Sequence, residues 1–106
     1  MFARMHTLQT TPEVHDEGLE LVKTELLPWL QDSTGFRGLL RLASPDRSKT
    51  VVITLWADEE SMQRSADAGR NLWSLITETA GSKHLALEDY EVTFFEAELT
   101  PDERPS

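Results

Sequence analysis

A chain of 106 residues with no cysteine and a formal net charge of −9 fits a single domain and excludes disulfide frameworks, thiolate nucleophiles and cysteine-based zinc sites. Its ten basic residues are scattered, whereas binding to nucleic acid or to an anionic membrane needs a clustered basic surface, so neither partner is expected. The absence of a run of about 18 apolar residues, and of a charged-then-apolar N-terminal signal, predicts a soluble, cytoplasmic protein.

The first predicted elements are a strand over residues 2–10 and a helix that follows it. Thr11 can cap this helix, and Pro12 suits its first turn. Apolar residues at steps of three and four mark its buried side: Leu19, Val22, Leu26, Trp29 and Leu30. Pro28 lacks the N–H that would bond to the carbonyl of Thr24, so a kink or an early end is expected near it.

A hairpin is predicted in the middle of the chain. Gly35 suits a left-handed position after the helix, and two short apolar strands over 36–43 and 49–56 flank the turn sequence "SPDRS". Asp58 can cap a second helix. Its apolar stripe comprises Met62, Ala66, Gly69, Leu72, Trp73, Ile76 and Ala80. The small residues in "SADAG" leave open whether this segment is one helix or two pieces.

The last predicted strand spans residues 90–99, before a tail over 100–106 that has no apolar anchor and is expected to be mobile. The element order strand, helix, strand, strand, helix, strand is that of a ferredoxin-like α+β domain over residues 1–99. It predicts a four-stranded antiparallel sheet with both helices on one face.

Apolar side chains point to both faces of this predicted sheet. In "TVVITLW", Ile53 and its alternate neighbours face one side, while Val52, Thr54 and Trp56 face the other. The predicted last strand alternates in the same way. Because two helices cover only one side, several hundred Å² of apolar surface would be left exposed, so a second copy of the chain is expected to cover it.

Three features together resemble the antibiotic biosynthesis monooxygenase family: "GFRG" before the second strand, "VVITLW" running into "ADEESM", and the element order over residues 2–99. The resemblance implies a dimeric α+β barrel, in which two sheets pack face to face. It also implies a separate pocket in each subunit, between sheet and helices, which the counterpart of Trp56 often faces.

The branches of that family differ in the residues that accompany the tryptophan. Members that oxidise polyketide aromatics without metal or flavin carry an asparagine and a tyrosine where this chain has Val52 and Met62. Neither replacement can do the same chemistry, because valine forms no hydrogen bond and methionine has no ionisable proton. Haem-degrading members carry an asparagine near the position of His6 and an iron-ligating histidine at that of Ala66, which disfavours haem oxygenation by their route.

His6 and Trp56 are the candidate catalytic residues. An imidazole on a central strand could accept a proton from a phenol or hydroquinone, and an indole could serve as a platform for a flat ligand. The structural alternatives are a histidine bonded to a neighbour within the sheet and a tryptophan that fills the core. The candidate ligand-binding residues are Arg4, Thr54, Met62 and Trp73. Arg4 could equally pair with a glutamate on the last strand.

No metal site is predicted, since the three histidines show no ligand spacing. The predicted function is that of a homodimeric, monooxygenase-like protein that acts on a small aromatic or polyketide-type molecule without a bound cofactor. Such chemistry requires a substrate that can become an electron-rich anion. Two alternatives stay open: a non-catalytic dimer that binds a small hydrophobic ligand or serves as an accessory or stress-related protein, and a weak haem binder.

Overall fold

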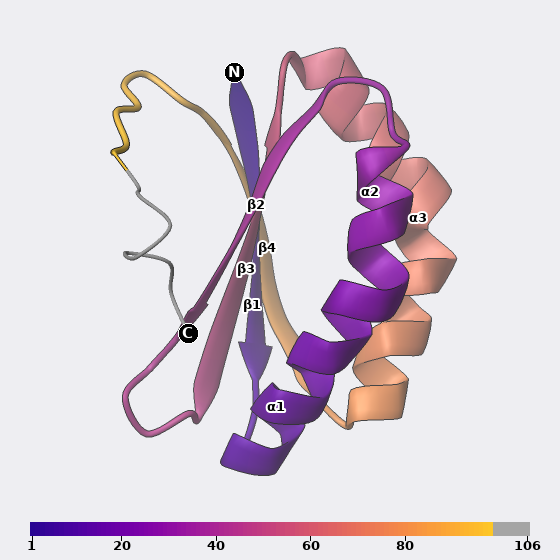
Figure 1. Ribbon diagram of the computed structural model, residues 1–106, viewed down its shortest axis with the longest axis vertical. Helices are drawn as coiled ribbons and strands as arrows, with labels where there is room; N and C mark the ends of the chain where they lie inside the picture. Colours follow the sequence, from indigo (N-terminus) through magenta and orange to yellow (C-terminus); the bar gives the residue numbers. More distant parts are fainter. Residues whose placement is uncertain (99–106) are drawn as a thin grey trace.

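The computed structural model describes residues 1–98, which form one sheet with helices on one side of it (Figure 1). The elements in chain order are β1 (Phe2–Gln9), α1 (Pro12–Leu21), the π-helical turn η1 (Val22–Leu26), α2 (Leu27–Gln31), β2 (Phe36–Ala43), β3 (Lys49–Trp56), α3 (Glu59–Ala80) and β4 (Lys83–Glu91). The strand order is β2-β3-β1-β4, with all neighbours antiparallel, so the predicted ferredoxin-like α+β fold is confirmed.

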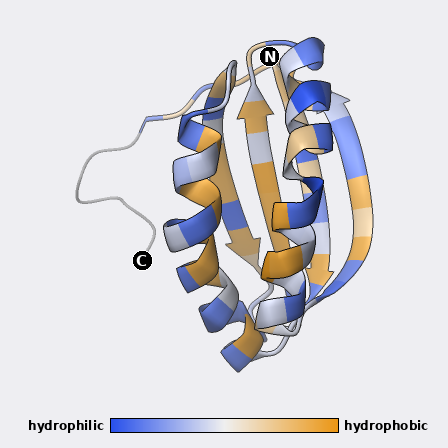
Figure 2. Ribbon diagram, turned by 90° about the vertical axis from the view of Figure 1, so that its right-hand side faces the viewer, coloured by the Kyte–Doolittle hydropathy of each residue, from blue (hydrophilic) through white to orange (hydrophobic). Residues whose placement is uncertain are grey.

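Both helical segments lie in front of the same face of the sheet in Figure 2. Thr11 caps α1 by accepting a hydrogen bond from the backbone N–H of Val14, and Asp58 caps α3 through that of Ser61. The core between sheet and helices contains the buried residues Val22, Leu26, Leu30, Trp56, Met62 and Ile76. Among residues 1–98, no helix is both long and apolar enough to cross a bilayer.

The helix that contains Pro28 neither ends nor breaks there. It widens into the π turn just before the proline, where the N–H of Leu27 bonds to the carbonyl of Val22. Pro28 then lies in the first turn of α2, a position that suits its fixed φ angle. The predicted irregularity is therefore present as a local change of helix type.

Helix α3 is continuous over Glu59–Ala80, so of the two readings of "SADAG" the single helix is correct. Gly69 in this stretch allows a close approach of Trp29. A Cβ atom at position 69 would lie 2.9 Å from Cη2 of that indole. The small residue is thus required by packing between the helices.

The prediction of a last strand over 90–99 is wrong. β4 spans Lys83–Glu91 and pairs with β1 over its length, whereas residues 92–98 lie outside the sheet and make one backbone bond to it, from Val92 N–H to the carbonyl of Met1. This segment leaves on the side opposite the helices (Figure 1). Pairing with β1 outweighed the stronger strand propensity of "VTFF". Leu99 and the predicted tail over 100–106 lie outside the described residues.

Two glycines have positive φ angles, and they differ in their surroundings. Gly35 and Gly81 both have φ of 82°. At Gly81 the nearest atom to an added Cβ would be Cγ2 of Val14 at 3.8 Å, whereas at Gly35 an added Cβ would overlap the side chain of Ser61.

Gly81→Ala is therefore expected to lower the free energy of unfolding by about 1 kcal/mol through left-handed strain alone. Gly35→Ala should cost about 3 kcal/mol, because steric overlap adds to the same strain. Urea unfolding of both variants measures the difference. Equal losses would contradict the role assigned to Ser61.

Candidate functional site

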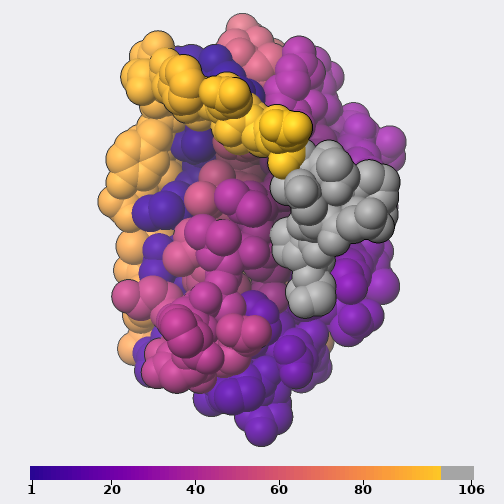
Figure 3. Space-filling view, turned by 60° about the vertical axis from the view of Figure 1, so that its left-hand side comes forward, coloured from indigo at the N-terminus to yellow at the C-terminus, as the bar shows by residue number. Residues whose placement is uncertain are grey.

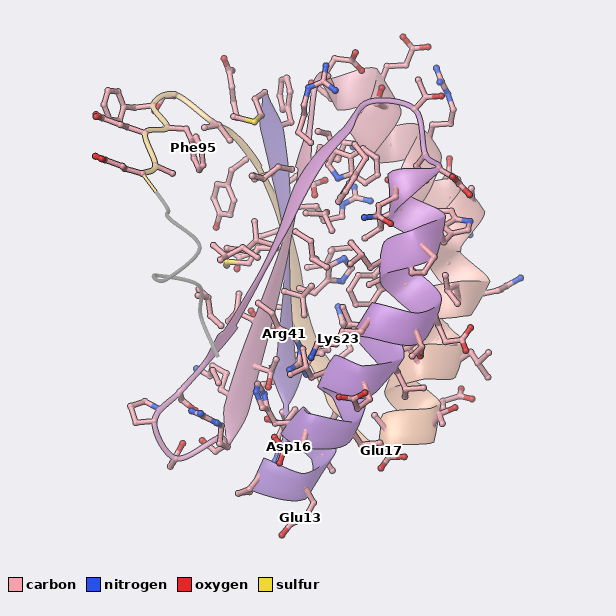
Figure 4. All side chains as sticks on the ribbon, in the orientation of Figure 1. Glu13, Asp16, Glu17, Lys23, Arg41 and Phe95 are labelled. Carbon is pink, nitrogen blue, oxygen red and sulfur yellow. The ribbon has the colours of Figure 1, made fainter. Side chains whose placement is uncertain are left out.

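A cavity of about 520 Å³ lies between the sheet and the helices, within the range of small-molecule pockets. Buried residues of β1 and β3 form its floor: Arg4, His6, Thr54 and Trp56. All three tryptophans of the chain line the cavity: Trp56 of β3 in the floor, Trp29 of α2 and Trp73 of α3. Figure 4 draws all side chains of the described residues, including those between the sheet and the helices.

The exposed lining residues mark the mouth of this cavity. They belong to α3 and β4 and comprise Gln63, Asp67, Arg70, Ser74, His84 and Leu87. Asp67 and Arg70 form an exposed ion pair there, with 3.2 Å between Oδ1 and Nη2. A ligand would therefore enter between α3 and the edge strand and meet a floor formed by the two central strands.

Strand alternation explains why His6 and Trp56 share this cavity. Antiparallel pairing sets His6 opposite Val52, Arg4 opposite Thr54 and Phe2 opposite Trp56. Directly opposed side chains point to the same face of a sheet. This face is the one under the helices.

Trp56 is both a core residue and part of the cavity wall. It is 1% exposed and packs edge-on against Phe36, with ring centroids 5.6 Å apart. Its Nε1–H donates to Oγ1 of Thr54 over 2.9 Å. Because this donor is already used, Trp56 offers a ligand its ring surface rather than its N–H.

His6 is held in place by two aromatic neighbours. Its ring stacks on Trp73, with centroids 3.8 Å apart and planes 16° apart, and its Nδ1 lies 3.4 Å from Nε2 of His84. Nε2 of His6 makes no hydrogen bond to residues 1–98 and is not among their fully buried unpaired atoms, so it is open to the cavity. Burial, together with the nearby His84 and Arg4, lowers the pKa of His6 to about 4. The imidazole is therefore neutral at pH 7.

Arg4 is paired within the protein. Its Nε and Nη2 donate to the two carboxylate oxygens of Asp89 on β4 over 2.7 and 2.8 Å. The hydrogen bond from Arg4 holds the pKa of Asp89 below its usual range. One reading of the sequence predicted that Arg4 pairs with a glutamate on the last strand. The partner is indeed an acidic residue of that strand, but it is an aspartate.

Met62 does not line the cavity. It is 1% exposed and packs in the core beside Trp56. Val52, the other position at which this chain departs from the polyketide-oxidising pattern, is also buried. Ala66, which stands where haem-degrading proteins carry a histidine, lines the cavity with a methyl group.

Sequence reasoning missed Trp29 and His84 as cavity residues, and Asp89 as the partner of Arg4. Trp29 was recognised only as part of a helix stripe. A last strand predicted to start at residue 90, seven residues after the actual start of β4, leaves both His84 and Asp89 outside it. Among residues 1–98, no cluster of three or more potential metal ligands occurs.

No protein-family model matches the chain, and no match is found among curated proteins. Solved structures do match. A Deinococcus radiodurans protein named as a candidate antibiotic biosynthesis monooxygenase superposes with a TM-score of 0.70 at 13% identity, covering 94% of this chain and 100% of that one. A monooxygenase from the gene ActVA-Orf6 of Streptomyces coelicolor, in complex with nanaomycin D, gives 0.65 at 17% identity, covering 91% and 92%.

The chain has the antibiotic biosynthesis monooxygenase fold. SnoaB from Streptomyces nogalater, a cofactor-independent oxygenase, shares it with a TM-score of 0.66 at 15% identity, over 92% of this chain and 97% of that one. At these identities the likeness concerns the fold. Within this antibiotic biosynthesis monooxygenase fold, the present chain places His6, Arg4 and three indoles around its cavity.

The low pKa of His6 predicts a specific acid sensitivity. Between pH 6.5 and about 4, the unfolded chain binds a proton at this histidine while the folded chain does not, so stability present above pH 6.5 is lost as pH falls. Over this window the wild type should lose about 3 kcal/mol more than the His6→Gln variant. Urea unfolding at several pH values tests this. Parallel pH dependence of the two proteins would contradict a buried neutral His6.

Proposed function

We propose that the protein is a cofactor-independent monooxygenase that acts on a small, planar aromatic or polyketide-type molecule. The observation that carries this proposal is the placement of a neutral, solvent-shielded His6 on the floor of a cavity lined by three indoles. Indole faces offer broad apolar surfaces on which flat aromatic ligands can stack. Two proteins that share the fold support the proposal by analogy: the monooxygenase bound to nanaomycin D for the kind of ligand, and the cofactor-independent oxygenase SnoaB for the kind of reaction.

The first chemical step is the transfer of a substrate O–H proton to Nε2 of His6. The resulting anion reacts with O₂, of which one oxygen atom enters the substrate and the other leaves as water, with the electrons supplied by the substrate. For a phenol with a free para C–H, the products are one quinone and one water. Arg4 lies beside His6 on the floor and can stabilise the anion, although Asp89 balances part of its charge.

The pKa of His6 narrows the range of substrates. Each unit by which the pKa of the substrate hydroxyl exceeds about 4 makes the proton transfer unfavourable by about 1.4 kcal/mol. A simple phenol, with a pKa of about 10, would therefore cost about 8 kcal/mol. The site favours hydroxyls made acidic by a conjugated carbonyl, as in hydroxylated anthrones and enolised diketones.

His6→Ala should reduce the oxidation of 1,8-dihydroxyanthrone by about 100-fold or more, because the base is lost. Oxygen uptake measures the rate, and quenching of tryptophan fluorescence by the matching anthraquinone measures binding, which should change little. Thr7→Ala, on the same strand but the opposite face, is the control. Binding without oxygen uptake by the wild type, across a panel of acidic phenols and anthrones, would favour the non-catalytic alternative.

The assembly we propose for this function is a homodimer. The face of the sheet away from the helices carries Leu40 and Leu42 on β2, each 46% exposed, next to Val51, Ile53 and Leu55 of β3. Phe94 and Phe95, in the segment of residues 92–98 that follows β4, are 81% and 61% exposed. Figure 3 brings this face forward and shows residues 92–98 (yellow) across one end of it. A second copy would cover these apolar side chains, since contiguous exposed apolar surface is typical of interaction sites.

Leu40→Glu combined with Leu42→Glu should convert a dimer into monomers at micromolar concentration, since the charges would be buried at the interface. Sedimentation velocity gives the mass. Leu75→Glu is the matched control, because Leu75 is 60% exposed but belongs to α3 on the helical side. A wild type that sediments as a folded monomer would overturn the proposed assembly.

A further inference from the structure

His84 is the second imidazole of the cavity, and a β-bulge brings it there. Thr7 pairs with Ala86, but Leu8 pairs with His84, so Leu85 is an extra residue in β4. In a regular ladder Leu8 would face Leu85, and the side chain of His84 would point to the open face of the sheet. Bulges that redirect a side chain in this way are concentrated beside active sites.

Only one proton can lie between the two nitrogens at which the histidines meet. Nδ1 of His6 lies 3.4 Å from Nε2 of His84, and the rings meet at 72°. Stacking on Trp73 limits rotation of the His6 ring. A neutral imidazole carries one N–H and one lone pair. Whether Nδ1 of His6 carries the proton at this contact therefore decides whether Nε2, its other nitrogen, presents a lone pair or an N–H to the cavity.

Two arrangements are possible, and they have opposite chemical consequences. If Nε2–H of His84 donates, Nδ1 of His6 accepts and the proton of His6 lies on Nε2, which then acts as a hydrogen-bond donor toward a ligand. If Nδ1–H of His6 donates to His84, Nε2 of His6 carries a lone pair and can act as a base. A protonated His84 permits only the first arrangement, because both of its nitrogens are then donors.

We propose that His84 is a positioning residue that selects the tautomer of His6, so that His6 can act as a base only when His84 is neutral. This proposal rests on the proposed function only in taking His6 as the base. Its structural support is the bulge, the single-proton contact and the exposure of His84 at the mouth of the cavity. Protonation of an exposed imidazole by solvent would thereby change the hydrogen-bonding character of a buried one.

The charged groups around the two histidines belong to β1, β4 and α3. Burial and His84 lower the pKa of His6 most, Arg4 of β1 lowers it further, and Asp89 of β4 raises it. Asp67 and Arg70 of α3 lie at the mouth and are paired with each other. From α2, only Trp29 and Leu30 line the cavity. Because each carboxylate near the pair already has an arginine partner, His84 is the group placed to set the tautomer of His6.

Long-range ¹H–¹⁵N correlation spectra of the histidine rings test the proposal directly, since protonated and unprotonated ring nitrogens differ widely in ¹⁵N shift. His6 is assigned by comparison with His6→Gln. When the pH is raised so that His84 passes from the protonated to the neutral form, the proton of His6 should move from Nε2 to Nδ1. In His84→Leu it should stay on Nε2, the nitrogen that a free neutral imidazole prefers to protonate. In His84→Gln, whose side-chain oxygen can accept from Nδ1–H, it should stay on Nδ1.

A His6 tautomer that is the same with His84 protonated and with His84 neutral in the wild type, or that still moves with pH in His84→Leu, would overturn the proposal. Activity provides a second readout. With 1,8-dihydroxyanthrone, kcat/KM of the wild type should fall at least about tenfold on acidification through the titration of His84, whereas His84→Gln should show a flat profile. A tautomer change without any effect of His6→Ala on turnover would refute the proposed function but leave this inference intact.

Discussion

The antiparallel register between β1 and β3 is the constraint on which the rest of the structure depends. It sets Arg4 opposite Thr54 and His6 opposite Val52, so one face of the two central strands carries both the apolar core and the polar floor of the cavity. Because side chains alternate with a period of two, a slip of one residue would move this set to the uncovered face. The hydrophobic contacts that fix the register, above all those of Trp56, therefore also fix the geometry of the site.

The floor of the cavity gives up stability that a fully apolar interior would provide. Burying a guanidinium and an imidazole is unfavourable unless each has a partner. Arg4 meets this requirement by its two hydrogen bonds to Asp89, and His6 by staying neutral and stacking on Trp73. Trp56 satisfies its own N–H through Thr54. Polar groups that are retained inside a small domain despite this cost are typical of functional sites.

Patterns that depend on local periodicity could be predicted from the sequence. The alternation in residues 49–56 and the helix stripes defined the fold, and they placed Trp56 on the same face as Val52 and Thr54. Interactions between distant segments could not be predicted. Pairing between β1 and β4 moved the last strand toward the N-terminus, and the bulge beside Leu8 turned His84 inward. The local sequence "SKHLALED" predicts neither the start of β4 nor the bulge, because both depend on pairing with the backbone of β1.

The π turn at residues 22–26 has a consequence for how the cavity wall is formed. Each residue of an α-helix turns the chain by about 100°, so one extra residue within a turn rotates everything that follows by nearly a third of a revolution. Helix α1 can thus face the end of the sheet near Arg41, while Trp29 and Leu30 of α2 face the cavity. The π turn therefore gives one continuous helical segment two different buried faces. Residues before it pack against the end of the sheet, and residues after it line the cavity, so substitutions on one face need not disturb the other.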